Sequence, residues 1–234
     1  MADFRERHIV VTGGTGALGT AVVGELLASG AICHVPYYID AEEQHFAHRS
    51  HPRVKLIGSA NLASQTVVKR IYEEVPKLWA SIHIAGGFAA WPIAETDEAE
   101  LMGMIRNNLL SCYLCCAAAV GAMRRNGSGG RIVNIAARPA LEPRIGAGAT
   151  GYTVSKAGVA ALTQALAAEV LKEDILVNAI APSTLDTEAN RKAMPKADHA
   201  AWPKPAEVAA IICNLAAPSN RVTSGAVIPV YGRA

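Results

Sequence analysis

Residues 8–19 read His8-Ile9-Val10-Val11-Thr12-Gly13-Gly14-Thr15-Gly16-Ala17-Leu18-Gly19. The β-branched run at the start predicts a short buried strand. An apolar pattern from about Thr20 to Ala28, closed by Gly30, predicts a helix after the glycines. A glycine turn alone is compatible with a plain structural role. Between a strand and a helix it favours a dinucleotide-binding unit, because the amides and dipole of a helix N-terminus attract a pyrophosphate.

Strand and helix patterns alternate along the rest of the chain. We expect strands at 8–12, 31–38, 54–58, 80–84, 131–135, 175–180 and 225–231, and further helices at 66–74, 98–125, 159–171 and 205–217. No internal repeat, low-complexity segment or linker interrupts them. Residues 1–234 are therefore expected to form a single Rossmann-like, doubly wound α/β domain with a parallel sheet of about seven strands flanked by helices.

Composition and charge narrow the class of protein. Half of the 234 residues are apolar and the formal net charge is only +2, so the sequence has no electrostatic footprint for nucleic acid. The start of the chain, residues 1–7, is too charged for a secretory signal. No apolar run reaches the roughly 20 residues that cross a bilayer. We expect a soluble cytoplasmic protein with no membrane partner.

The cysteines leave two interpretations open. Cys112-x-x-Cys115-Cys116 is compatible with zinc or redox chemistry, or with small thiols buried in a helix. The apolar helical pattern around them, and the lack of a second ligand pair, favour buried thiols. The seven histidines form no metal-binding spacing, so no metal is expected. Five cysteines without a secreted framework suit a reducing compartment.

A tyrosine and a lysine one helical turn apart are the strongest chemical signal. Residues 151–158 read Gly-Tyr-Thr-Val-Ser-Lys-Ala-Gly, so Tyr152 and Lys156 share a face of a predicted helix. A free phenol has a pKa of about 10, and a neighbouring ammonium lowers it towards neutrality. Such a phenol can work as a general acid or base. The spacing alone also fits an ordinary surface pair; the glycine turn, and Asn108 in an apolar segment, favour the catalytic interpretation.

Together these motifs resemble the short-chain dehydrogenase/reductase family, and the resemblance covers nearly the whole chain. The family's glycine pattern starts at Thr12 and ends at Gly19, with Ala17 in place of its middle glycine. The resemblance implies that Tyr152 is the acid/base and that Lys156 tunes it and contacts the nicotinamide ribose. It also implies that Asn108 supports the lysine through a bound water.

The same resemblance implies a set of coenzyme contacts. They are Thr12, Gly13, Gly16, Ala17, Leu18 and Gly19 at the pyrophosphate, Tyr37 after the second strand, Asn61 at the adenine, Ala85 and Gly86 beside the adenosine ribose, Tyr152 and Lys156, and Thr184 and Thr187 on the nicotinamide side.

The choice between NAD(H) and NADP(H) depends on the end of the second strand. An acid there would bind the ribose of NAD, but Tyr37 occupies the position. No arginine stands beside it, and His48, Arg49 and Arg53 are the nearest basic residues. Both coenzymes stay open, and the missing acid favours NADP(H).

The substrate side departs from the family at one position. Ala137 stands where the family carries its catalytic serine. Either the enzyme does not reduce a simple ketone, or another donor such as Arg138 or a water fills the gap, or activity has been lost. Phe88 and Trp91 follow a strand's carboxyl end, where they would form an aromatic wall for a flat substrate or merely pack the loop.

A later run narrows the resemblance. Residues 184–198 resemble the dihydropteridine reductase branch, which also carries alanine for the serine and an aromatic after Ala-Gly-Gly. This implies reduction of a flat conjugated C=N or carbonyl substrate. A ketone/enone reductase, a quinone reductase and a non-catalytic NAD(P)-sensing module are the alternatives. Residues 182–203 suit a substrate lid, and the apolar helices 98–125 and 159–171 suit a homodimer or homotetramer interface.

Overall fold

A seven-stranded parallel sheet forms the centre of the computed structural model, which describes residues 3–234. Its strands are β1 (His8–Thr12), β2 (Ile32–Pro36), β3 (Val54–Ile57), β4 (Leu78–His83), β5 (Gly130–Ile135), β6 (Ile175–Pro182) and β7 (Val227–Val230). Their order across the sheet is β3-β2-β1-β4-β5-β6-β7. The chain reverses its winding between β1 and β4, which is where open α/β sheets bind their ligands. The predicted fold class is confirmed.

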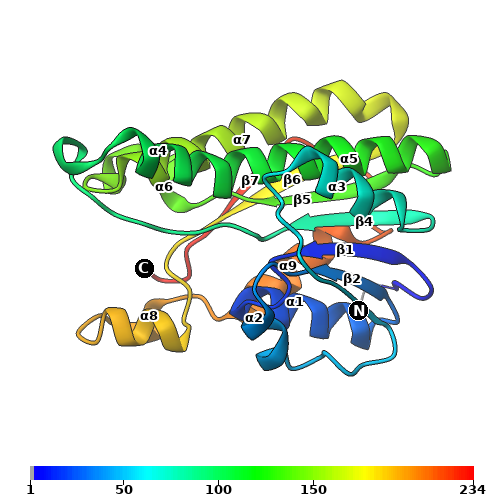
Figure 1. The fold of residues 1–234 in the computed structure, drawn as a ribbon, viewed down its shortest axis with the longest axis horizontal. Coiled ribbons are helices and arrows are strands. Elements are labelled where there is room, and N and C mark those ends of the chain that lie inside the picture. Colours follow the sequence, from blue (N-terminus) through cyan, green and yellow to red (C-terminus); the bar gives the residue numbers. More distant parts are fainter. Residues whose placement is uncertain (1–2) are drawn as a thin grey trace.

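Two helix layers enclose the sheet (Figure 1). Helices α1 (Ala17–Ala28) and α9 (Pro205–Ala216) pack together below it, and their buried aliphatic side chains form one core with the sheet. Helices α3 (Gln65–Glu73), α5 (Ser111–Asn126) and α7 (Thr150–Val170) cover the other face and form a second core. Both faces of the strands are thus buried, which explains their continuous apolar sequences.

The long helix predicted at 98–125 has an internal irregularity. It runs as α4 (Glu98–Met104), a π-helical turn at Ile105–Leu110, and α5. Asn108 lies within the π-turn and is buried. Such single π-turns disturb the regular ladder and are frequent at functional sites. The sequence indicated this bulge only through an asparagine in an apolar segment.

Several short helices were not predicted. They are α2 (Asp40–His45), α6 (Arg138–Leu141) and α8 (Glu188–Ala193), and α8 lies inside the segment 182–203 that was predicted as a loop. Each is four to six residues long, too short for a clear period in the sequence. Figure 1 shows α8 standing apart from the helix layers.

Helix α7 contradicts one expectation of the sequence analysis. With the turn that follows, Thr150–Glu173 is long and apolar enough to cross a bilayer by length and composition. In the fold it packs on the sheet with Thr153, Ser155 and Lys156 buried on its inner side. Burial against the sheet accounts for part of its apolar character, because 39% of the most apolar stretch is buried.

Candidate active site

The glycine turn closes tightly at the end of β1. Gly13 has a positive φ of 65°, and a Cβ at this residue would lie 2.7 Å from the backbone nitrogen of Ala85. A Cβ on Gly19 would overlap the backbone of Gly13 and Gly14. Only glycine fits these two positions, so the turn brings the start of α1 against the chain that leaves β4. The predicted strand–turn–helix arrangement is confirmed.

The N-terminus of α1 fits an anion. Gly16 is its N-cap and supplies no side-chain cap, and the first turn carries no acid. The first amides of a helix have no partner within the helix, and the dipole favours negative charge there. Ala17 is the first residue of the helix, and the next two residues, Leu18 and Gly19, are buried. A helix start of this kind attracts an anionic group such as a pyrophosphate.

The chain after β4 is fixed to the glycine turn and to the π-turn. The amide of Ala85 donates to Thr12 Oγ1 at 3.3 Å. Asn108 Oδ1 accepts from the Gly87 amide at 2.8 Å, and its Nδ2 donates to the Gly87 carbonyl at 3.0 Å. A Cβ on Gly86 would come within 2.5 Å of Asn108 Oδ1 and 3.4 Å of Lys156 Nζ. Asn108 thus holds residues 85–87 close to the lysine.

Helix α7 presents the tyrosine and the lysine one turn apart, as the sequence predicts. Lys156 is buried, and its Nζ donates to the carbonyl of Ile135 at the end of β5 at 2.8 Å. Ser155 links α7 to the π-turn, because its hydroxyl accepts from Asn108 Nδ2 at 3.0 Å. That hydroxyl also donates to the Tyr152 carbonyl at 2.7 Å.

The protonation of the pair differs from the sequence expectation. Burial raises the pKa of Tyr152 to about 12, so the phenol is not poised near neutrality in the free chain. Burial also lowers the pKa of Lys156 to about 8, with the nearby Cys112 acting in the opposite direction. The lysine ammonium points to the Ile135 carbonyl, and desolvation by burial is the cause of the shift at the phenol. At pH 7 the tyrosine is a phenol with a proton to give.

The serine position of the family is apolar. Ala137 follows β5, is the N-cap residue of α6 and is 3% exposed. Arg138, the donor considered as a replacement, is engaged elsewhere. Its Nε donates to Glu142 at 3.0 Å, its Nη1 donates to the Ala234 carbonyl at 2.9 Å, and its guanidinium lies 4.6 Å from the Tyr231 ring centre.

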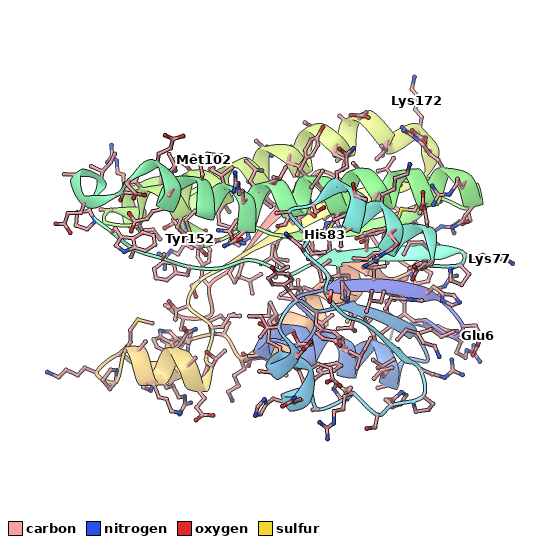
Figure 2. All side chains as sticks on the ribbon, viewed as in Figure 1. Glu6, Lys77, His83, Met102, Tyr152 and Lys172 are labelled. Carbon is pink, nitrogen blue, oxygen red and sulfur yellow. The ribbon has the colours of Figure 1, made fainter. Side chains whose placement is uncertain are left out.

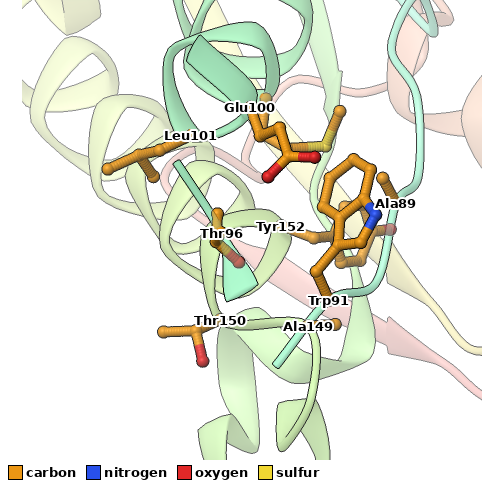
Figure 3. Close-up of a pocket in the computed structure, with 10 residues that line it drawn as sticks. Ala89, Trp91, Thr96, Glu100, Leu101, Ala149, Thr150 and Tyr152 are labelled. Carbon is orange, nitrogen blue, oxygen red and sulfur yellow. The ribbon is translucent and has the colours of Figure 1, made fainter. Parts of the chain in front are cut away.

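Two aromatic side chains lie next to Tyr152. The Phe88 ring meets the Tyr152 ring edge-on with centroids 4.9 Å apart, and Phe88 is 68% exposed. Trp91 lines a small pocket with Tyr152 and Glu100, and Figure 3 shows the carboxylate and the indole facing into it. The other lining residues are Ala89, Thr96, Leu101, Met104, Ala149, Thr150 and Gly151. Both predicted aromatics therefore stand beside the phenol.

The basic residues expected near the end of β2 are engaged with other groups. Tyr37 follows the strand, and its hydroxyl lies over Gly58. Arg53 pairs with Glu6 at 2.7 Å and donates to the Gly30 carbonyl, at the other end of the strands. Arg49 donates to the Gln44 carbonyl, and His48 contacts the Thr20 carbonyl. Instead, an acid stands at the glycine turn, because Glu42 accepts from the Thr15 hydroxyl at 3.3 Å.

Three other predicted coenzyme contacts lie in loops at the strand ends. Asn61 follows β3, and its side-chain oxygen accepts from the Ala63 amide at 3.0 Å, which closes a turn. Thr184 follows β6 and is partly buried. Thr187 caps α8, because its hydroxyl accepts from the Asn190 amide at 3.2 Å.

The structure also gathers residues that the sequence analysis did not combine. His83, at the end of β4, lies with Cys112 and Cys116 of α5. Spacing could not reveal the cluster, because only the parallel sheet brings residue 83 beneath residues 112–116. The contacts of Ser155 and Gly87 with Asn108 were also missed. The Tyr-x-x-Ser-Lys spacing held the only signal for Ser155.

Comparisons with known proteins agree with this geometry. Residues 7–198 match the family model described as short chain dehydrogenase. The (2S)-[(R)-hydroxy(phenyl)methyl]succinyl-CoA dehydrogenase subunit BbsD of Thauera aromatica is 32% identical over 194 residues, which are 79% of this chain and 75% of that protein. The 3-oxoacyl-[acyl-carrier-protein] reductase MabA of Mycobacterium tuberculosis is 28% identical over 244 residues, covering 98% and 93%.

Solved structures share the fold. ElxO with NADP bound superposes with a TM-score of 0.88 at 22% identity, over 97% of this chain and 98% of that one. The crystal structure of gox2181 has a TM-score of 0.90 at 22% identity, over 98% and 96%.

Proposed function

Because the chain belongs to the short-chain dehydrogenase/reductase family and is thus an NAD(P)-dependent oxidoreductase, we propose that it reduces a flat conjugated C=N or carbonyl substrate, as dihydropteridine reductases do. Tyr152 is the proton donor in this proposal. Lys156 and Asn108 position the groups around it, and the glycine turn of residues 12–19 holds the pyrophosphate.

The observation that carries the substrate class is the buried methyl group at Ala137. A hydroxyl at this position would stabilise the charge that develops on a carbonyl oxygen during reduction. A quinonoid dihydropterin accepts hydride into a conjugated C=N system and forms no alkoxide at the reacting centre. It needs a proton on nitrogen but not the missing hydroxyl. Phe88 and Trp91 offer the flat apolar surface that such a ring system stacks on.

A bound reduced nicotinamide coenzyme supplies the hydride in this chemistry. Tyr152 gives its phenolic proton to the substrate, and its raised pKa keeps that proton in place at neutral pH. Lys156, charged below a pKa of about 8, stabilises the phenolate that is left. Asn108 keeps Gly86 and Gly87 against the lysine. Residues 182–203, with α8, form the lid, and Thr184 and Thr187 contact the nicotinamide side.

The coenzyme preference in our proposal is NADP(H). Tyr37 stands where an acid would exclude a 2′-phosphate, and the fold neighbour ElxO holds NADP. Glu42 opposes this preference, because it places a carboxylate at Thr15. Titration with NADPH and NADH separately, and again with Glu42→Gln, decides the point. The proposal is supported if the wild type binds NADPH with a lower Kd than NADH and if Glu42→Gln lowers the Kd for NADPH further. Binding of NADH by the wild type that is as tight as that of NADPH, or tighter, rejects the proposal.

The substrate class is tested by steady-state assays with both reduced coenzymes. We expect a higher kcat/KM for a quinonoid dihydropterin than for a panel of ketones, enones, quinones and 3-oxoacyl thioesters. The second candidate, a ketone reductase, is favoured by the 28% identity to MabA, which is named as a 3-oxoacyl reductase. Fast reduction of 3-oxoacyl thioesters with no pterin turnover would establish it. Coenzyme binding without turnover of any substrate would indicate the sensing module.

The proposed assembly is a homodimer or homotetramer in the cytoplasm. Exposed apolar side chains lie on the outer helices, including Met102 on α4, Tyr113 on α5 and Val154 on α7. Two such helices from each subunit would bury these side chains together. All five cysteines are free and buried, which suits a reducing compartment.

A further inference from the structure

A buried cluster of sulfur and imidazole groups lies between α5 and the sheet. Cys112 and Cys116 are one turn apart on α5, and His83 is the last residue of β4. Figure 2 labels His83 near the centre of the molecule. One ligand atom from each residue lies within 4.8 Å of those of the other two. The three side chains are at most 5% exposed. Thiolate and imidazole are the two commonest ligands of protein zinc.

The hydrogen bonds around the cluster fix where its protons point. Asn134 Nδ2 donates to Thr163 Oγ1 at 2.9 Å, and that hydroxyl donates to the Val159 carbonyl at 2.8 Å. The amide oxygen of Asn134 must therefore face the cluster. It accepts from His83 Nδ1 at 2.8 Å and from the Cys116 thiol at 3.4 Å. The hydrogens of His83 Nδ1 and the Cys116 thiol thus both point at the Asn134 amide oxygen. A single cation between these three groups would take the place of the two hydrogens.

We propose that Cys112, Cys116 and His83 bind a Zn²⁺ ion. The Asn134 amide oxygen faces the same point and is placed to take the fourth position. With Zn–S of about 2.3 Å and Zn–N of about 2.0–2.1 Å, adjacent sulfur and nitrogen ligands of a tetrahedral zinc lie about 3.5 Å apart. Cys116 Sγ and His83 Nδ1 are 3.5 Å apart. This pair of ligand atoms therefore already stands at the separation of a tetrahedral site, and Cys112 Sγ lies within 4.8 Å of both.

Charge and protons balance in this site. The two thiols release two protons to solvent, and the two thiolates neutralise the divalent ion. His83 remains neutral, because its single proton moves from Nδ1 to Nε2 when Nδ1 binds the metal. Nε2 lies 2.7 Å from Ser81 Oγ and 3.2 Å from the Tyr72 hydroxyl, which accept that proton. A zinc-bound histidine almost always donates its second N–H in this way.

The third cysteine of the motif has different surroundings. Cys112 lies in the cluster with Cys116 and His83. Cys115 contacts Tyr72 instead. Cys115 is equally buried on the same helix but stands outside the cluster. It is therefore a matched control.

The test is a zinc titration of the purified full chain, with zinc also supplied during expression and refolding because the site is buried. A chromophoric chelator competes for the metal, and elemental analysis gives the stoichiometry. We expect one Zn²⁺ per chain, bound by the wild type and by Cys115→Ser, and at least about tenfold weaker binding by Cys112→Ser and Cys116→Ser. Circular dichroism checks that each variant is folded.

A second measurement does not depend on the variants. Co²⁺ bound to the wild-type chain should give the intense visible and thiolate charge-transfer bands of a tetrahedral sulfur-ligated site, and Zn²⁺ should abolish them. The proposal is overturned if the folded wild type binds no zinc under either loading condition. It is also overturned if Cys115→Ser loses the metal as the other variants do, or if Co²⁺ gives only octahedral spectra. None of these readouts involves coenzyme or substrate, so their result is independent of the proposed reductase activity.

Discussion

Ala137 is the residue at which this chain departs most clearly from its family's chemistry. Replacing it with serine restores a hydroxyl beside β5. Because such a donor acts on a developing oxyanion, Ala137→Ser should raise kcat/KM for a ketone towards the factor of about 10²–10³ that a single oxyanion donor supplies. Turnover of a quinonoid dihydropterin should change by less than about threefold, because no oxyanion develops at its reacting centre. Steady-state kinetics with both substrates measures the contrast.

The neighbouring Ala136 gives the control. It is equally buried, but adjacent residues on an extended chain point to opposite sides. Ala136→Ser should therefore help neither substrate. A gain of the same size for both substrates in Ala137→Ser would refute the interpretation that the missing hydroxyl selects against alkoxide-forming reactions.

Lys156 sets an upper pH limit. Its folded pKa of about 8 lies below the ordinary 10.5, so the ammonium is lost as pH rises through 8. With the coenzyme as the varied substrate, kcat/KM reports the free enzyme and should fall above about pH 8. Lys156→Arg should move this limb beyond the measurable range, because arginine stays charged. A limb that stays near 8 in the variant would assign the titration to another group.

The same shift has an opposite effect on stability. Between pH 8 and 10.5 the unfolded chain binds the lysine proton and the folded chain does not. This residue's contribution to the free energy of unfolding therefore increases with pH over that window. Activity and stability should diverge there.

At the scale of elements, the β1–turn–α1 unit depends on the absence of a side chain at Gly19. A Cβ would overlap the backbone of Gly13 and Gly14, which cannot move without opening the turn. Gly19→Ala should lower the melting temperature and abolish coenzyme binding. Gly103→Ala, on α4 with no atom near its Cβ, should instead stabilise by about 0.5–1 kcal/mol. Thermal melts with and without NADPH compare the two; a Gly19→Ala chain that binds NADPH normally would contradict the cradle.

Elements with strong local patterns could be predicted from the sequence. All seven strands lie where their β-branched runs indicate, because both faces of a parallel strand are buried. The short helices α2, α6 and α8 could not be predicted, since four to six residues set no period. The same distinction holds in the candidate site. The spacing of the tyrosine and the lysine is local, and the two lie one turn apart as predicted. The direction of the Tyr152 pKa was wrong, because burial depends on tertiary packing.

At the scale of the whole molecule, the outer helices carry exposed apolar side chains. Tyr113 on α5 is 55% exposed, and a carboxylate there would oppose burial between subunits. Tyr113→Glu should shift the mass in light scattering from an oligomer towards 24.5 kDa. Val222→Glu, at a residue that is 92% exposed in a loop, should leave the mass unchanged. A wild type that is itself monomeric would refute the proposed assembly.

The measurement that bears most directly on the proton donor is a single turnover. Enzyme loaded with reduced coenzyme is mixed rapidly with a quinonoid dihydropterin, and coenzyme oxidation is followed for the wild type and Tyr152→Phe. The phenol is expected to supply a factor of about 10²–10⁴ in rate. Tyr152→Phe should therefore react more slowly by this factor. Its coenzyme Kd should stay within about threefold of the wild-type value, which is a change in binding free energy of less than about 1.4 kcal/mol. An undiminished rate in the variant, or an equal loss of coenzyme binding, would contradict the role of Tyr152.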